Sequence, residues 1–128
     1  MPLQGLTIIP PTERQARESR FPGTRAETIV NHATPTNGFV VSVVALDPGS
    51  RTRLHYHQVD TFEYVLNGVA RVYDQHGNSE IVTPSMGVYY PAGPASAHSW
   101  ETVGNIAVEF LFIYTAAPGQ NDGLTPVE

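Results

Sequence analysis

The chain has 128 residues, with 11 glycines, 11 prolines, no cysteine and a formal net charge of −5. Without cysteine it can form no disulfide, thiolate metal ligand or cysteine nucleophile, and its acidic balance argues against a nucleic-acid partner. All seven basic residues are arginines, which excludes lysine-based Schiff-base chemistry. We expect one cytoplasmic domain over residues 1–128, because no apolar run approaches the roughly 18 residues of a membrane span and no secretory signal is present.

Residues 1–24 form an N-terminal arm that contains the helical candidate of the sequence, residues 13–19. This segment carries Arg14, Arg17 and Arg20. The three arginines predict either a solvated charged face or an anion-binding edge. We favour the solvated face, because runs of charge usually face water.

Residues 25–115 read as short strands separated by turns of Gly, Pro, Asn and Asp. The stretch 39–46 is almost wholly apolar, which predicts a strand buried on both faces. Strands that recur every 8 to 12 residues or so are typical of an all-β barrel or sandwich. The Gly/Pro-rich tail, residues 116–128, is expected to be partly disordered. The predicted strands are residues 25–32, 39–46, 51–57, 61–66, 69–73, 80–83, 88–90, 98–101 and 106–114.

Three histidines carry the chemistry of the chain. His55 and His57 form a His-x-His pair in the predicted strand 51–57. In a strand, residues i and i+2 point to the same face about 7 Å apart, so both imidazoles can reach one metal ion. In a helix they would lie about 200° apart and could not. His98 follows the sequence Tyr-Tyr-Pro-Ala-Gly, which predicts a second strand closed by a turn, and adds a third imidazole.

The two histidine segments resemble the conserved motifs of the cupin family, G-x5-H-x-H-x3-E-x6-G and G-x5-P-x-G-x2-H-x3-N. The resemblance implies a double-stranded β-helix, also called a jelly-roll barrel, with a core over about residues 25–115. It also implies a homodimer in which a short N-terminal strand, expected at residues 6–9, packs on a second subunit. Seven residues match the motifs in order, with two extra residues before the last one: Gly49, His55, His57, Gly68, Pro91, Gly93 and His98.

The chain departs from the family at the acidic ligand, where Thr61 replaces the glutamate of the first motif. Ser85 and Thr102 replace the opening glycine and closing asparagine of the second motif. The metal ligands that the resemblance implies are therefore the three histidines, as in the three-histidine cupins that include diketone and thiol dioxygenases. Glu63 lies two residues beyond Thr61 on the same strand face. It could be a displaced ligand, a general base or a buried acid, and we expect it to point inward as the catalytic residue.

Three neutral imidazoles suit one divalent transition-metal ion better than Mg²⁺ or Ca²⁺. Fe(II) is favoured, and Zn, Ni, Cu or Mn stay open. With iron, the expected function is dioxygenation of a small, chelating, enolisable molecule. With zinc, it is cyclisation or isomerisation of a polyketide-like substrate, with Glu63 as acid and base. A non-catalytic ligand-binding barrel is the third alternative. For each of these three functions, we expect the partner to be a small molecule and no membrane to be involved.

Four further polar residues have open roles. Arg51 and Arg53 share the face of the histidine pair if the strand is regular, and would then anchor an anionic substrate or form a rim salt bridge. Glu109 interrupts an apolar strand, and its side of the sheet cannot be fixed from the sequence. His76 falls in a predicted turn and is interpreted as an exposed histidine.

Overall fold

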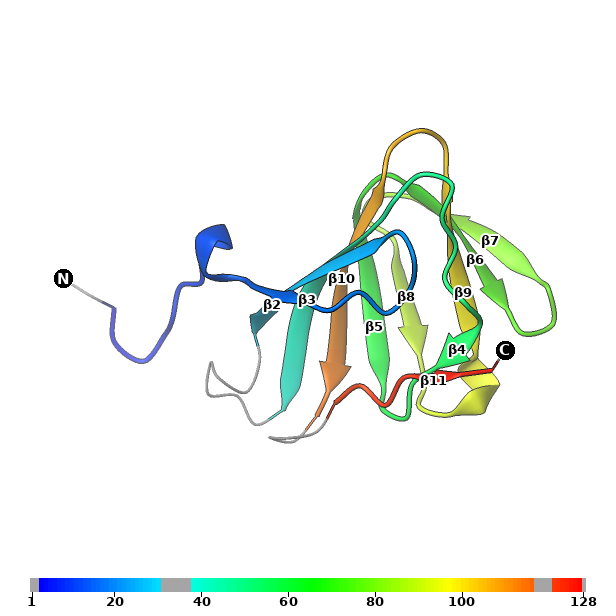
Figure 1. Cartoon of the computed structure of the whole chain (residues 1–128). Coiled ribbons are helices and arrows are strands. Elements are labelled where there is room, and N and C mark those ends of the chain that lie inside the picture. The colour runs from blue at the N-terminus through cyan, green and yellow to red at the C-terminus, as the bar shows by residue number, and fades with distance from the viewer. Residues whose placement is uncertain (1–2, 31–37, 117–120, 128) are drawn as a thin grey trace.

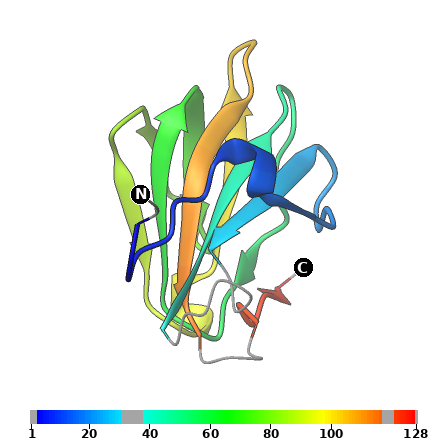
Figure 2. The ribbon, with the colours of Figure 1, turned by 90° about the vertical axis from the view of Figure 1, so that its left-hand side faces the viewer.

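The computed structural model describes residues 3–30, 38–116 and 121–127, and consists of two antiparallel β-sheets with two short 3-10 turns (Figure 1). The six-stranded sheet has the order β1-β2-β3-β10-β5-β8, and Figure 2 looks onto it. The five-stranded sheet has the order β11-β4-β9-β6-β7. The predicted all-β jelly-roll architecture is confirmed. None of the described residues forms a helix that could cross a membrane.

The strands are short and most lie close to their predicted positions. The elements are β1 (Gln15–Arg17), β2 (Thr24–Val30), β3 (Phe39–Leu46), β4 (His55–Tyr56), β5 (Thr61–Asn67), β6 (Val69–Asp74), β7 (Ser79–Val82), β8 (Gly87–Tyr90), β9 (His98–Val103), β10 (Val108–Thr115) and β11 (Thr125–Pro126), with 3-10 turns η1 (Pro11–Glu13) and η2 (Pro94–Ser96).

Strand β10 lies between β3 and β5 and anchors the core. Its buried side chains alternate along the strand, because successive side chains point to opposite faces of a sheet. The ring of Phe110 stacks on Trp100 of β9 at a centroid distance of 4.6 Å and so joins the two sheets. In β3, by contrast, only one face is fully buried, so the prediction of burial on both faces is wrong.

The N-terminal arm does not form the helix expected at residues 13–19. It makes the single 3-10 turn η1 and then β1, which pairs with the edge of β2 through Gln15–Thr28 and Arg17–Ala26. Pro10 occupies the N-cap position and supplies no capping side chain. Pairing with an open sheet edge satisfies the backbone groups of this segment and overrides its weak local helix preference.

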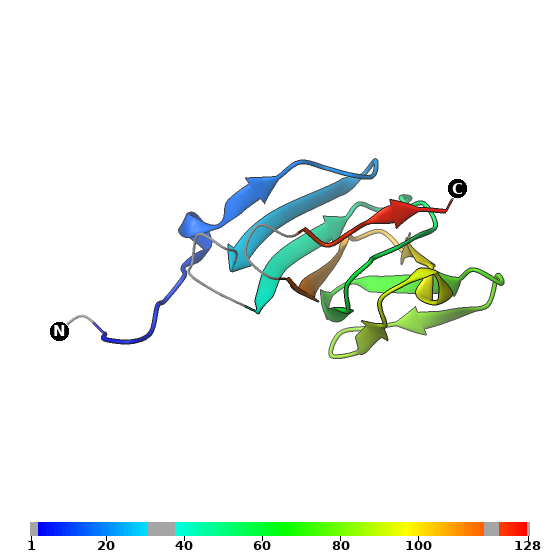
Figure 3. The ribbon, with the colours of Figure 1, turned by 90° about the horizontal axis from the view of Figure 1, so that it is seen from below.

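One part of the C-terminal tail, which was expected to be partly disordered, docks on the barrel, whereas residues 117–120 and 128 lie outside the described residues. Residues 121–127 lie along β4, and β11 pairs with that strand. The amide of Gln58 donates to the carbonyl of Gly123 at 3.1 Å. Gly123 has a φ of +62°, and a Cβ there would lie 2.7 Å from Cβ of Gln58, so the approach requires glycine. Figure 3 shows that this segment, in red, runs on the same side of the molecule as the N-terminal strands, in blue.

Candidate metal centre

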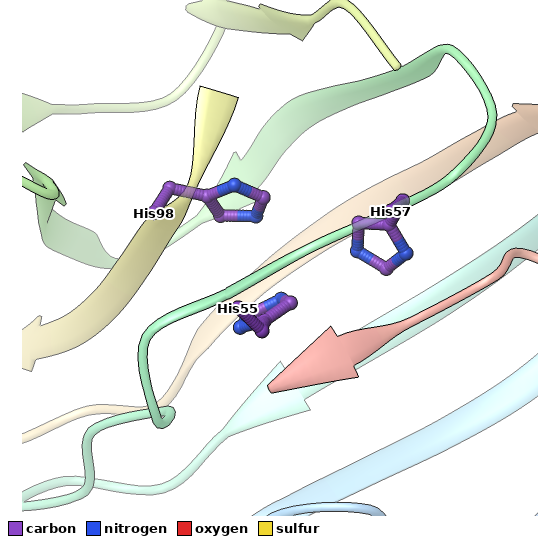
Figure 4. Close-up of side chains that lie close together, drawn as sticks. All are labelled: His55, His57 and His98. Carbon is purple, nitrogen blue, oxygen red and sulfur yellow. The ribbon is translucent and has the colours of Figure 1, made fainter. Parts of the chain in front are cut away.

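The structure brings together the three histidines singled out by the sequence (Figure 4). His55, His57 and His98 are 5, 4 and 3% exposed. Each offers one ring nitrogen, and the three nitrogens lie within 4.8 Å of one another. This spacing allows three imidazoles to converge on one ion, so the geometry expected for a metal centre is present.

Backbone pairing sets this arrangement. His55 and His98 are register partners across β4 and β9, so their side chains leave the sheet side by side. The amide of Gly93 donates to the carbonyl of His57 at 2.9 Å, which ties the turn before His98 to the histidine pair. The two extra residues found in the second motif fall in the segment between Gly93 and His98, where the 3-10 turn η2 forms.

Two of the rings are oriented by backbone carbonyls. Nδ1 of His55 lies 2.6 Å from the carbonyl oxygen of Arg53, and Nδ1 of His98 lies 2.9 Å from that of Ser96. Because a carbonyl oxygen can only accept, Nδ1 carries the proton in each ring and Nε2 keeps its lone pair. Nε2 of His98 is buried and has no hydrogen-bond partner within the described residues. Metal-binding histidines are held in the same way.

Burial keeps the three imidazoles uncharged. It lowers the pKa of His57 to about 4 and that of His98 to about 3, and it also lowers the pKa of His55. The mutual repulsion of the rings acts in the same direction on His57 and His98. All three therefore offer lone pairs at neutral pH, as a ligand must.

An ion pair between the two ends of the chain faces His57. Oδ2 of Asp122 lies 3.7 Å from Nδ1 of His57 and 2.6 Å from Nη1 of Arg20. Asp122 is 4% exposed although it lies in the Gly/Pro-rich tail. The sequence pattern gave no signal for Asp122, because nothing local indicates that this tail folds back on the histidines.

Glu63 points into the barrel, as expected from its register with Thr61. Glu63 is 4% exposed, and its Oε1 lies 3.9 Å from Nε2 of His98. It does not belong to the group of three mutually close nitrogens. Burial raises the pKa of Glu63 to about 8, against the lowering effect of Arg20. The structure thus holds a protonatable carboxyl beside one candidate ligand.

A cavity opens in front of these groups. Its volume is about 580 Å³, counted to its open mouth. His55, His57 and Glu63 line its polar part, and residues 17–21 of the N-terminal arm form part of its wall. The rest is largely apolar and aromatic, from Val44, Leu46, Trp100, Phe110, Phe112 and Leu124.

Arg51 and Arg53 do not share the face of the histidines. Both are exposed, whereas Thr52 and His55 are buried, so the alternation of a regular strand breaks at the bend at Leu54. Arg51 stacks on the ring of Tyr73 at 4.0 Å and donates to Oγ of Ser99 at 2.9 Å. The strand is not regular here, so the condition under which these arginines would share the face of the histidines is not met.

The remaining candidates lie away from the centre. Glu109 is half-buried on the outer face of β10, opposite to the buried Phe110 and Phe112. His76 is exposed in its turn, as expected. His32, interpreted as a surface histidine, lies outside the described residues.

Comparison with known proteins agrees with this architecture. The model of the cupin domain matches residues 42–114. Among solved structures, the polyketide cyclase RemF from Streptomyces resistomycificus has a TM-score of 0.79, with 21% identity over 96% of this chain and 86% of its own. A sugar phosphate isomerase of the cupin superfamily from Silicibacter pomeroyi has a TM-score of 0.74, with 24% identity over 88% of this chain and 77% of its own.

An oxalate decarboxylase from Lactobacillus farciminis matches at a TM-score of 0.72 and 20% identity, over 98% of this chain and 38% of its own. No curated protein matches the sequence. At these identities the structural likeness establishes the fold, and the chemistry has to be argued from the residues of the site.

Proposed function

This chain belongs to the cupin family, and on that premise we propose that it is a metal-dependent enzyme that acts on a small organic molecule. The observation that carries the proposal is the cluster of three buried, uncharged imidazoles, two of them fixed by backbone carbonyls. Two of these rings, those of His57 and His98, have a buried nitrogen without a hydrogen-bond partner among the described residues, which is costly unless they bind a ligand.

The donor set fits one divalent transition-metal ion. Three imidazole nitrogens favour Fe(II), Zn, Ni, Cu or Mn over ions that prefer oxygen. Three protein ligands leave coordination positions open to a substrate. Such an ion would supply Lewis-acid polarisation of a carbonyl or, with iron, redox chemistry.

Among reaction types, proton transfer in a cyclase or isomerase has the stronger support. The carboxyl of Glu63 faces the cavity 3.9 Å from Nε2 of His98, next to the point where a bound carbonyl compound would lie. In this proposal Glu63 takes a proton from the carbon beside the carbonyl and returns it elsewhere on the product. The proposal agrees with the names of two structural neighbours, a cyclase and an isomerase.

Dioxygenation with Fe(II), favoured from the sequence, is the second candidate. It is supported by a donor group that contains three neutral histidines and no carboxylate. The ligands of such a site do not compensate the charge of the ion. They also leave coordination positions open for an enolate and O₂. Glu63 would then position the substrate rather than transfer its proton.

Metal content is the first test. We expect about one transition-metal ion per chain in protein purified without a histidine tag. The variant His57→Ala should lose the ion, and the matched control His76→Ala, in an exposed turn, should keep it. A wild-type protein that takes up no metal even after reconstitution would overturn the enzyme proposal and leave a ligand-binding barrel.

The reaction type is tested on the metal-loaded protein with a panel of small ketones and diketones. Deuterium exchange at the α carbon is followed by NMR, and O₂ uptake is followed with an electrode. Proton transfer predicts deuterium exchange without O₂ uptake. The variant Glu63→Gln should abolish this exchange and leave the metal content unchanged. Substrate loss coupled to O₂ uptake would instead select the dioxygenase.

We also propose that the chain forms a homodimer through its N-terminal arm. Leu6 and Ile8 are 63% and 71% exposed, so the arm carries apolar surface that packs on nothing within the described residues. Light scattering on the full chain and on a chain lacking residues 3–10 tests this, with a monomer expected only for the shortened chain. The cytoplasmic location stays a prediction.

A further inference from the structure

One cation of the cavity wall, Arg17, has no ion-pair partner among the residues that the structure describes. Arg17 lies at the end of β1, is half-buried, and lines the cavity. Its Nη1 donates to Oγ of Ser42 at 3.1 Å, and Ser42 is fully buried on β3. Its guanidinium carbon lies 5.9 Å from the ring centroid of Phe112, within the range of a cation–π contact. The guanidinium is therefore held in a defined position by two strands.

The neighbouring arginines are neutralised. Within the described residues, Arg14 pairs with Glu27 at 3.8 Å and Arg20 pairs with Asp122 at 2.6 Å. Arg17 forms no ion pair with a described residue. Glu18, the next residue, is exposed and makes no such contact with Arg17.

A half-buried cation without a partner is unusual, since buried charges in proteins are normally paired. Burial lowers the pKa of Arg17, which reflects its removal from water, and the guanidinium still stays protonated at any ordinary pH. The wall around it is mainly apolar and aromatic. Asp122 acts on Arg17 only at a distance and already forms an ion pair with Arg20, so an anion that entered the cavity would meet a guanidinium with no direct ion-pair partner in a weakly screened environment.

Phe112 links this cation to the histidines. Its ring centroid lies 5.3 Å from that of His57 and 5.9 Å from the guanidinium carbon of Arg17. A small molecule lying along the aromatic wall would therefore have one end near Arg17 and the other near the three imidazoles.

We propose that Arg17 binds the carboxylate of the substrate, and that the cavity takes a small apolar or aromatic carboxylate whose opposite end reaches the histidine centre. The planar guanidinium offers two parallel donors that match a carboxylate. The apolar and aromatic side chains beside Arg17 suit the hydrocarbon part of such a molecule. The part that concerns the reacting end rests on the proposed metal-dependent function, whereas the binding of the carboxylate does not.

The test compares benzoate with benzamide, which has nearly the same shape and no charge. Metal-free protein is used, so that the carboxylate cannot bind a metal ion instead. NMR titration should give an affinity for benzoate about tenfold or more above that for benzamide. The pairs acetate and acetamide, and cyclohexanecarboxylate and its amide, cover smaller and bulkier ligands.

Variants of Arg17 then locate the effect. Arg17→Gln should bind both members of each pair equally, and Arg17→Lys should keep part of the preference because it keeps the charge. Arg25→Gln is the matched control, since Arg25 is exposed, pairs with Asp47 and does not line the cavity. It should keep the full preference.

Equal binding, or no binding, of acid and amide in every pair for the wild type would overturn the proposal without any variant. A phenyl phosphate that binds more tightly than benzoate would overturn the assignment to carboxylates. Metal content, measured in parallel, separates the two hypotheses. Arg17-dependent preference in a protein that takes up no metal leaves this proposal standing and removes the enzyme. Full metal content without a preference for the carboxylate would overturn this proposal and leave the metal-dependent enzyme standing.

Discussion

The cavity has two walls of different origin. One wall belongs to the β-sheets and carries His55, His57 and Glu63, with His98 packed behind them on β9. The other is made by the two ends of the chain, which meet at the ion pair of Arg20 with Asp122. In the proposals made above, the sheet wall presents the groups for chemistry and the wall of the chain ends supplies the charge that selects a ligand; the chain ends also place the carboxylate of Asp122 beside His57.

The two walls also differ in what holds them. The sheet wall is fixed by continuous backbone pairing, such as that of β6 with β9. The C-terminal segment is held by a few contacts, including the amide of Val127 on the carbonyl of Leu54 at 2.9 Å. We therefore expect changes in the sheet wall to alter stability and metal binding together, and changes in the chain ends to alter metal binding or ligand choice with a smaller cost to the fold.

The largest expected effect is the response of the metal-free sheet wall to acid. The pKa values of His57 and His98 are about 4 and 3 in the fold and about 6.5 when exposed. Below about pH 6.5 the unfolded chain binds more protons than the fold at these histidines, so the stability that they contribute falls as the pH drops toward 3. Each histidine should contribute about 1.4 kcal/mol per pH unit in that window. Glu63, with a pKa of about 8 in the fold, acts in the opposite direction and lowers stability as the pH rises from about 4.5 to 8.

Urea unfolding of metal-free protein at a series of pH values measures this loss. His98→Gln serves as the comparison, because it removes one of the buried titrating histidines and should lower the slope by one histidine's share. Equal slopes for the wild type and the variant would contradict the prediction.

The second prediction concerns the carboxylate that the C-terminal segment places beside His57. Asp122→Asn keeps the size of the side chain and removes its charge. We expect the affinity for Zn²⁺ to fall about 10- to 100-fold, as for other groups that orient a ligating histidine. Competition with a chromogenic chelator measures the affinity. Asp47→Asn, at an exposed ion pair with Arg25, is the control, and equal affinities in the two variants would rule out a role for Asp122.

The smallest effect is expected at the other partner of the ion pair. Arg20→Gln leaves Asp122 in place and removes a side chain that is 35% exposed. Because water screens the pair on that side, we expect a loss of about 1 kcal/mol in stability and a few-fold loss of Zn²⁺ affinity. Thermal unfolding and the same chelator competition test this. A loss as large as that of Asp122→Asn would mean that the two residues act as one unit.

Sequence periodicity was sufficient to predict the direction of the side chains where the strands are regular. The pairing of His55 with His57, and the inward direction of Glu63, both follow from residues i and i+2 sharing a face, and the structure places all three side chains inside. The same argument failed for Arg51 and Arg53, because one bend at Leu54 reverses the face on which they lie. A bend of one residue leaves no periodic trace in so short a segment.

The sequence by itself determined the all-β fold, the three histidines and the buried carboxyl beside them, because these depend on patterns only a few residues long. The tertiary structure alone decided the wall made by the chain ends. Arg17 lies in the cavity because β1 pairs with β2 instead of forming a helix. Asp122 faces His57 because Gly123 allows the tail to approach Gln58. Such contacts join segments that are far apart in the sequence. Their free energy depends on residues at the other end of the chain, which the pattern of a short segment does not include.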